Sequence, residues 1–323
     1  MRPTALIGAI SALGSAVAAS FFYGAYRSDM KKIAARLSAG SLRAETIAGP
    51  IEYGREGSGP PIFLIHGAGG GFDQGLAIGR EMFGRGFDLI APSRFGYLGT
   101  HVPDIASPAA QADAHAALLE SLDIPQAVIV GASAGAPSAI EMALRHPSRV
   151  AALILAVPRA WAPGIELSAV PMESARVLRA VESGGDFAYW SAMHLARSSV
   201  VHFLGVPAKL DSKASPTERA RISEIMRNVL PVSRRVNGIA NDGATQIARW
   251  PLERVKAPAL VISAEDDLYG TLPCARYTAQ QIPGAELMVL ASGGHLMLGR
   301  IEEVRERVAR FLERVNRRLA ADA

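Results

Sequence analysis

The sequence predicts an α/β fold with a mostly parallel, doubly wound sheet, and three observations support this prediction. Short apolar runs rich in Val, Ile and Leu recur along the chain, and continuous runs of this kind suit strands that are covered on both faces. Segments with helical periodicity separate these runs, which favours right-handed crossovers with helices on both faces of the sheet. The 323 residues are 49% hydrophobic and 20% charged, a composition that supports a packed core and excludes wholesale disorder.

An uncharged segment at residues 3–26 opens the chain. As a helix it would extend about 36 Å, against a bilayer hydrocarbon core of about 30 Å, so we expect a single N-terminal membrane anchor. A helical stalk is expected to continue it to Gly40, and residues 1–40 then form an N-terminal unit. A cleaved signal peptide and a buried or interfacial helix are the alternatives.

Basic residues follow the anchor segment and bear on its orientation. They are Arg27, Lys31, Lys32 and Arg36, against Arg2 and the amino terminus in front of it. Because positive charge favours the cytoplasmic side of a membrane, we expect the rest of the chain to be cytoplasmic. Export after signal cleavage is the alternative.

The region after the stalk alternates between predicted strands and helices. Residues 42–53 predict two short strands around the Gly-Pro pair at 49–50. The further strands are predicted at residues 62–65, 87–90, 127–130, 150–157, 259–262 and 287–290. The helices are predicted at residues 76–85, 108–122, 136–145, 272–281 and 301–319. Residues 41–157 and 253–323 are therefore expected to form one core.

Residues 158–252 interrupt this rhythm. They contain no strong strand pattern, but they do contain helical stretches at 174–181, 187–196 and 217–230. We therefore predict a helical insertion over residues 158–252.

Charge and cysteine content exclude several function classes. The 34 Lys and Arg residues are spread along the chain and form no dense run, and the formal net charge is only +4. This pattern does not favour a nucleic-acid partner. The single cysteine, Cys274, excludes an intrachain disulfide and a thiolate metal cluster. We expect neither a metal site nor a cofactor.

A G-x-S-x-G string at residues 131–135 is the strongest chemical signal. It directly follows the predicted strand at 127–130 and opens the helix that begins at Ala136. A serine on such a sharp strand–helix turn is an exposed nucleophile, and the glycines allow strand and helix to approach closely. We therefore predict that Ser133 is the nucleophile. The alternative is a Gly-rich helix cap in which Ser133 only bonds a backbone amide.

A glycine-rich loop at residues 66–71 follows another predicted strand. It matches neither a phosphate loop nor a dinucleotide fingerprint. Such a loop can turn backbone amides toward a developing oxyanion. We predict that the amides of Ala68 and Ala134 form the oxyanion hole, with Gly69 as a substitute for Ala68. We expect His66 to orient the loop through a hydrogen bond.

Candidates for an acid and a base lie beyond the two last strands. Asp266 and Asp267 follow the strand at 259–262, and His295 follows the next strand. Because active groups of open parallel sheets gather at the carboxyl ends of strands, these side chains are expected to meet Ser133. His295 would take the serine proton, and one of the two aspartates would orient the imidazole.

Together these motifs resemble the α/β-hydrolase superfamily, from residue 42 to the C-terminus apart from the insertion. The resemblance implies the α/β-hydrolase fold, with residues 158–252 as a helical cap. The family often carries its acid in a G-x-x-D loop, and the match to residues 264–267 favours Asp267 over Asp266. The loop at 93–100 resembles a D-x-x-G-x-G pattern but begins with Ser93.

These motifs predict a serine hydrolase that cleaves a carboxylic ester, or a related acyl bond, through an acyl-enzyme on Ser133. The expected partner is a small-molecule substrate with an apolar acyl or alcohol part. One alternative is C–C bond hydrolysis of a diketone-like substrate. The other is a non-catalytic, membrane-tethered binding module of the same fold.

Overall fold

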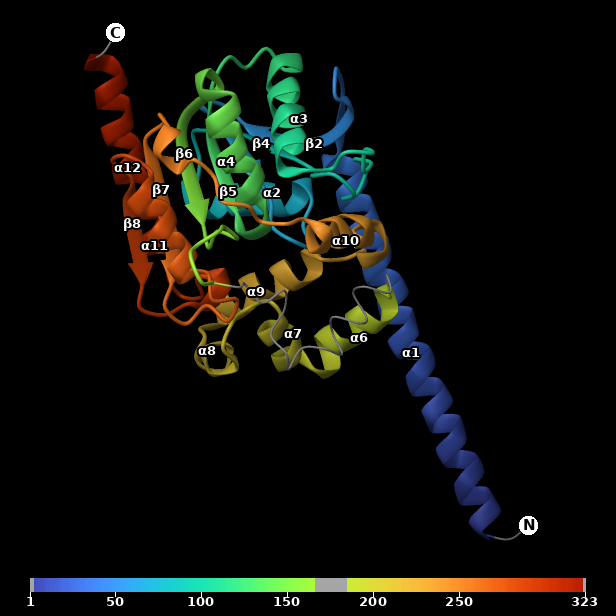
Figure 1. Ribbon diagram of the computed structural model, residues 1–323. Coiled ribbons are helices and arrows are strands. Elements are labelled where there is room, and N and C mark those ends of the chain that lie inside the picture. The colour runs from blue at the N-terminus through green and yellow to red at the C-terminus, as the bar shows by residue number, and fades with distance from the viewer. Residues whose placement is uncertain (1–2, 166–184, 322–323) are drawn as a thin grey trace. The chain divides into compact units, whose positions relative to one another are not determined.

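The computed structural model describes residues 3–165 and 185–321, and it forms two compact units, Met1–Ala39 and Gly40–Ala323 (Figure 1). The first unit is helical, within α1 (Pro3–Gly40), which covers the predicted anchor and stalk. Within the described ranges, no helix is both long and apolar enough to cross a membrane. The predicted transmembrane segment is therefore not confirmed, and the cytoplasmic location stays a prediction.

The second unit is built on an eight-stranded sheet with the order β1-β2-β4-β3-β5-β6-β7-β8. Its strands are β1 (Leu42–Thr46), β2 (Gly49–Gly57), β3 (Pro61–Ile65), β4 (Asp88–Pro92), β5 (Ala127–Ala132), β6 (Val150–Ala156), β7 (Ala259–Ala264) and β8 (Glu286–Leu290). The β1–β2 and β2–β4 pairs are antiparallel, and all other pairs are parallel. The predicted mostly parallel sheet is confirmed. The hairpin turn lies at residues 47–48, and Gly49 begins the second strand at a φ of 93°.

The helices of this unit begin where the sequence supplies start signals. Ser107 caps α3 by accepting the Ala110 amide, and Pro108 occupies the first helical position, where its missing N–H costs nothing. The helices outside the 158–252 segment are α2 (Phe72–Phe83), α3 (Pro108–Ser121), α4 (Ala136–Arg145), α11 (Leu272–Gln281) and α12 (Ile301–Ala321). Each overlaps a helix that the periodicity predicts.

Alternate residues of β3 pack on the two faces of the sheet. Phe63 and Ile65 join a buried cluster with side chains of α3, α4 and α11. Leu64 points to the other face, where α2 lies against it at Gly75 and Gly79. Helices α2 and α12 pack together there, so the sheet is covered on both faces, and its continuous apolar strands are explained.

Helices also fill the described part of the segment between β6 and β7. They are α6 (Asp186–Leu195), α7 (Arg197–Phe203), α8 (Ala208–Lys213), α9 (Pro216–Asn228) and α10 (Val236–Ala244). In Figure 1 the arrows of β6 and β8 point toward α7, α8 and α9, so these helices lie beyond the carboxyl ends of the strands. The helix predicted at residues 174–181 lies outside the described residues.

The loop after β4 begins with Ser93, where the D-x-x-G-x-G pattern has an aspartate, and Glu52 of β2 supplies a carboxylate in its place. Ser93 donates a hydrogen bond of 2.8 Å to the Glu52 carboxylate, which also accepts the Gly99 amide at 2.8 Å and the Ser41 hydroxyl at 2.8 Å. Ser93 in turn accepts the amide of Phe72 at 3.2 Å. A neighbouring strand thus supplies the carboxylate that binds the loop, and this buried charge is well hydrogen-bonded.

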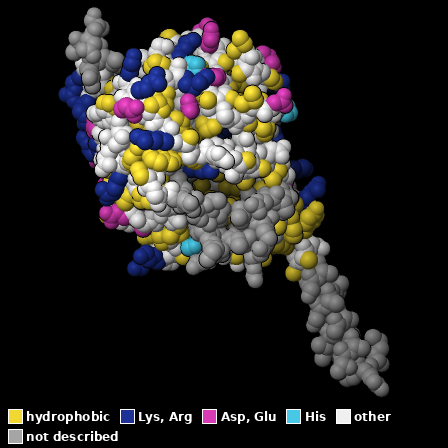
Figure 2. All heavy atoms as spheres, viewed as in Figure 1, with side chains coloured by type: hydrophobic (Ala, Val, Ile, Leu, Met, Phe, Trp, Pro, Cys, Tyr) yellow, Lys and Arg dark blue, Asp and Glu magenta, His cyan; other side chains and the backbone are white. Residues whose placement is uncertain are grey.

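The surface view agrees with the absence of a dense basic run in the sequence. On the face seen in Figure 2, Lys and Arg side chains lie among Asp, Glu and hydrophobic side chains and form no single large patch.

The close approach of α2 to the sheet predicts the effect of Gly75→Ala. The added methyl would lie 2.7 Å from the Ala91 Cβ and 3.0 Å from the Leu64 carbonyl oxygen. We expect the free energy of unfolding to fall by about 1–3 kcal/mol, because the strain exceeds the gain in helix propensity. Urea unfolding followed by circular dichroism measures it. The control is Gly243→Ala in α10, where the methyl meets nothing within 4 Å and stability should be unchanged or higher.

Candidate active site

Ser133 lies on a strained turn between β5 and α4. Its φ is 50°, a left-handed conformation that non-glycine residues rarely adopt, and a short 3₁₀ turn, Ser133–Gly135, leads into the helix. A Cβ at Gly131 would lie 2.6 Å from that of Ala139, and one at Gly135 would lie 2.5 Å from the Ile65 carbonyl oxygen. The two glycines therefore allow the tight packing that presents the Ser133 hydroxyl.

His295 lies in the loop after β8 and contacts both Ser133 and Asp267. Its Nε2 is 2.8 Å from the Ser133 Oγ, and its Nδ1 is 2.9 Å from one carboxylate oxygen of Asp267 and 3.1 Å from the other. Because the carboxylate can only accept, Nδ1 carries the proton and Nε2 is free to accept from the serine. The structure thus brings together three residues that are far apart in the sequence.

The Asp267 carboxylate is almost fully buried and fully hydrogen-bonded. It accepts the Tyr269 amide at 2.9 Å and the Thr271 hydroxyl in addition to the imidazole. Burial by itself raises the pKa of Asp267, but His295 and the hydrogen-bond donors outweigh it and hold that pKa below its ordinary value. The group is therefore a carboxylate at neutral pH.

Asp266 has a different position. Its carboxylate accepts the amide of Gly294 at 2.8 Å, and Gly294 has a φ of 60° immediately before His295. Asp266 therefore holds the loop that carries the histidine, and Asp267 contacts the imidazole itself.

The glycine-rich loop, residues 66–71, lies next to Ser133. A Cβ at Gly67 would be 3.2 Å from that of Ser133, and Ala68 and Ala134 both line the cavity in front of the serine. The Gly69 amide donates to the Tyr97 hydroxyl at 3.3 Å. Gly69 is thereby occupied, so the substitute that the sequence allowed for Ala68 is not available in this structure.

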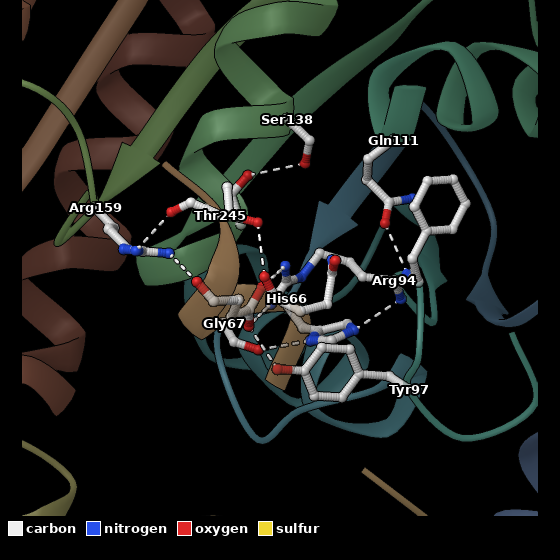
Figure 3. Close-up of polar contacts among 12 residues, drawn as sticks. His66, Gly67, Arg94, Tyr97, Gln111, Ser138, Arg159 and Thr245 are labelled. Atoms are coloured by element: carbon white, nitrogen blue, oxygen red, sulfur yellow. Dashed lines mark hydrogen bonds and ion pairs between the residues drawn. The ribbon is translucent and has the colours of Figure 1, made fainter. Parts of the chain in front are cut away.

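His66, the first residue of this loop, has a buried side chain that binds the backbone of the loop (Figure 3). Its Nε2 accepts the Arg94 amide at 3.0 Å, so its Nδ1 carries the proton and donates to the Gly67 carbonyl at 2.7 Å. Burial first, and then the charge of Arg94, hold the pKa of His66 well below its ordinary value. A neutral, fully hydrogen-bonded His66 has the loop-orienting position that the sequence predicts.

Sequence reasoning missed a polar network that connects the glycine-rich loop, through Arg94 and Tyr97, to α10. Arg94 forms two hydrogen bonds of 2.7 Å with the Asp242 carboxylate, and the Tyr97 hydroxyl donates to the same carboxylate at 2.5 Å. Arg159 donates to the Asp242 carbonyl at 2.7 Å and to that of Thr245 at 3.1 Å. Figure 3 shows Arg94 and Tyr97 beside His66, and Arg159 reaching Thr245. No local signal could pair residues almost 150 positions apart.

A second buried link joins the same loop to the segment between α9 and α10. Arg235 is fully buried, pairs with Asp73 at 3.0 Å and donates to the Gly70 carbonyl. A buried ion pair adds little net stability because desolvation is costly, but removal of one partner leaves an uncompensated charge. The glycine-rich loop is thus fixed from two sides.

A cavity of about 340 Å³ opens in front of Ser133 and His295. Its walls are mostly apolar, with Ala77, Ile78, Met82, Phe203, Leu204, Ile225, Val229, Ile239, Leu296, Met297 and Ile301 among the lining residues. Among the residues that the structure describes, no cluster of three or more His, Cys, Asp or Glu side chains could hold a metal ion. The arrangement is a small-molecule pocket with a few convergent polar groups.

Known proteins with similar sequences and structures include hydrolases. The "Uncharacterized hydrolase YcgS" of Bacillus subtilis is 27% identical over 273 residues, 79% of this chain and 92% of the relative. The 2-hydroxymuconate semialdehyde hydrolase of Pseudomonas putida is 29% identical over 270 residues, 80% of this chain and 87% of the relative. The solved structure of an alpha/beta hydrolase fold protein from Nakamurella multipartita is 27% identical, with a TM-score of 0.66 over 84% of this chain and 98% of that one.

The family model for the alpha/beta hydrolase fold matches residues 60–299. This range contains the turn at Ser133, the glycine-rich loop and the loop that carries His295. The protein therefore belongs to the alpha/beta hydrolase fold family.

Proposed function

We propose that this protein is a serine hydrolase that cleaves a carboxylic ester, or a related acyl bond, through an acyl-enzyme on Ser133. One observation carries the proposal. The hydrogen bonds from Ser133 through His295 to Asp267 are continuous, and they end at a mostly apolar cavity. Activated serine, oriented base and buried carboxylate are the three parts that acyl transfer needs.

In the first step the Ser133 Oγ attacks the carbonyl carbon while its proton passes to the His295 Nε2. The carbonyl oxygen becomes an oxyanion, which the amides of Ala68 and Ala134 stabilise together with the N-terminus of α4. The tetrahedral intermediate then collapses, the bond to the alcohol breaks, and His295 gives its proton to the departing oxygen. Asp267 stabilises the transient imidazolium throughout.

In the second step water replaces the alcohol. His295 takes a proton from water as the hydroxide adds to the acyl carbon, and the same amides hold the second oxyanion. Collapse of this intermediate breaks the bond to the Ser133 Oγ, which recovers a proton from His295. The net reaction consumes one water and yields an acid and an alcohol.

Hydrolysis of a C–C bond is the second candidate, because the Pseudomonas putida relative is a 2-hydroxymuconate semialdehyde hydrolase. Ester cleavage is favoured because both arginines that line the cavity already have partners within the protein. Arg159 is engaged by backbone carbonyls of α10 and the residue after it, and Arg221 is engaged by two carboxylates. Neither is left as an open site for an acidic substrate.

The first prediction tests the nucleophile. Ser133→Ala should lower kcat for a small water-soluble ester by a factor on the order of 10³ or more, because no acyl-enzyme can form. Labelling by a fluorophosphonate probe should disappear at the same time, while thermal unfolding stays close to that of the wild type. A fully active Ser133→Ala protein would exclude the mechanism, and a wild-type protein that the probe does not label would favour a non-catalytic binding module.

The second prediction separates the two aspartates. Asp267→Asn should cost on the order of 10³ to 10⁴ in kcat, because the amide no longer fixes the imidazole tautomer. Asp266→Asn should cost far less, because its side-chain oxygen can still accept the Gly294 amide. Steady-state kinetics of both variants give the ranking, and the reverse order would assign the orienting role to Asp266.

The third prediction concerns the support of the oxyanion loop. Tyr97→Phe keeps the ring but removes the hydroxyl between the Gly69 amide and Asp242, so the loop loses one of its links to α10. We expect kcat to fall about 10- to 100-fold, since small displacements of catalytic groups are costly. The matched control is Tyr189→Phe, which removes a buried hydroxyl that bonds only the Met226 carbonyl among the described residues. An equal loss of kcat in both variants would contradict a specific role for Tyr97.

A further inference from the structure

The cavity in front of Ser133 extends along α2, the helix that forms one of its walls. Five residues of α2 line it: Gln74, Ala77, Ile78, Glu81 and Met82. Their spacing places them on one face of the helix, over a length of about 12 Å. Gln74 lies at the end near Ser133, because its side chain accepts the Gly67 amide at 3.0 Å. The cavity therefore extends from the oxyanion loop along α2.

Helix α9 forms a second wall and runs antiparallel to α2. Its end is near the oxyanion loop, where a Cβ at Gly69 would lie 3.7 Å from the Val229 side chain. Its earlier part is near Glu81, where Arg221 forms an ion pair with an N–O distance of 3.1 Å. Ile225 lines the cavity between these points. Two helices thus line the cavity along this length, and we call this part of the cavity of about 340 Å³ the channel.

The Glu81–Arg221 ion pair crosses the distal end of the channel. Arg221 also binds the Glu218 carboxylate at 3.2 Å and the Leu296 carbonyl at 2.9 Å, so its guanidinium is fixed on three sides. The side chains of Arg221 and Glu81 are only 13% and 24% exposed. A fixed and largely buried pair is a firm boundary for a chain that enters from Ser133.

The charges along the channel select for an uncharged ligand. Each charged group that lines it has a partner: Glu81 with Arg221, and Asp242 with Arg94. Arg159 donates to two backbone carbonyls. A charged chain would have to displace one of these partners, whereas a hydrocarbon chain only replaces water against apolar walls.

We propose that this channel binds the unbranched, uncharged alkyl chain of the substrate's acyl group, and that the Glu81–Arg221 pair limits the chain length. The inference rests on the proposed acyl-enzyme function. The acyl group is bound to Ser133 from the first step until water releases it in the second, so it suits a channel that is bounded at its far end. The alcohol leaves after the first step and needs an open path.

The experiment measures kcat/KM for p-nitrophenyl esters from acetate to myristate. For the wild type, we expect an increase of roughly two- to fourfold per CH₂ until the chain reaches the ion pair, and a decrease beyond it. Ala77→Leu fills the middle of the channel, and the octanoate-to-acetate ratio of kcat/KM should fall about tenfold or more. Arg80→Ala is the control. Arg80 lies about one turn after Ala77 on α2, but its side chain is exposed and paired with Glu56 outside the channel.

A second pair of variants tests the boundary. Glu81→Ala shortens the end wall while Arg221 keeps Glu218 and the Leu296 carbonyl, so the preferred acyl chain should become longer. Glu81→Gln keeps the size of the side chain and should keep the wild-type length limit. Fluorophosphonate titration of active sites normalises each variant for the fraction of folded enzyme.

The outcomes separate this inference from the proposed function. If esters are hydrolysed but Ala77→Leu leaves the ratio unchanged, or if kcat/KM of the wild type does not depend on the acyl chain length, the chain site is wrong and the hydrolase stands. Calorimetric binding of n-octanol gives a readout without catalysis, and Ala77→Leu should weaken it about tenfold. Octanol binding that Ala77→Leu weakens, in a protein that cleaves no ester, would keep the chain site and reject the proposed function. Equal octanol affinity in both proteins would overturn the chain site.

Discussion

The turn at Ser133 is the constraint on which the rest of the site depends. A non-glycine residue at a φ of 50° is held there only because its surroundings are tightly packed. Gly131 and Gly135 make this packing possible, since any side chain at either position would overlap Ala139 or the backbone of β3. The same contact with β3 brings the glycine-rich loop against the serine, so Ser133 and this loop are held by the same packing contact.

The oxyanion loop is held from behind and from the side of the inserted helices. His66, its first residue, binds the loop backbone from the buried side, while Tyr97 and Arg235 connect the loop to α10 and to the segment before α10. These buried polar groups cost desolvation free energy, and their partners offset much of that cost without adding great stability. What they supply is a single arrangement of the loop, which the proposed acyl transfer requires because hydrogen-bond donors must be in place before charge develops.

Much of the fold could be predicted because its signals are local. Strand positions follow from apolar runs, and helix positions follow from periodicity and from start signals such as Ser107-Pro108. The predicted membrane span is not confirmed, since absence of charge over residues 3–26 is a weaker property than the hydropathy that a bilayer crossing requires. The turn between β1 and β2 lies two residues before its predicted position, because Gly49 takes its positive φ at the start of the strand rather than within the turn.

By itself, the sequence determined the alternation of strands and helices, the turn that carries Ser133, and the order of Ser133, an aspartate pair and His295. Each of these depends on residues that are neighbours in the chain, or on the rule that carboxyl ends of parallel strands share one edge. The tertiary structure decided which aspartate meets the imidazole, which amides of the loop are occupied, and how Arg94, Asp242 and Arg235 lock the inserted helices to the core. It also decided that Glu81 and Arg221, 140 residues apart, form an ion pair beside the cavity. The reason is physical: hydrogen bonds and ion pairs between distant segments act only after the chain has folded, so they leave no periodic pattern in the sequence.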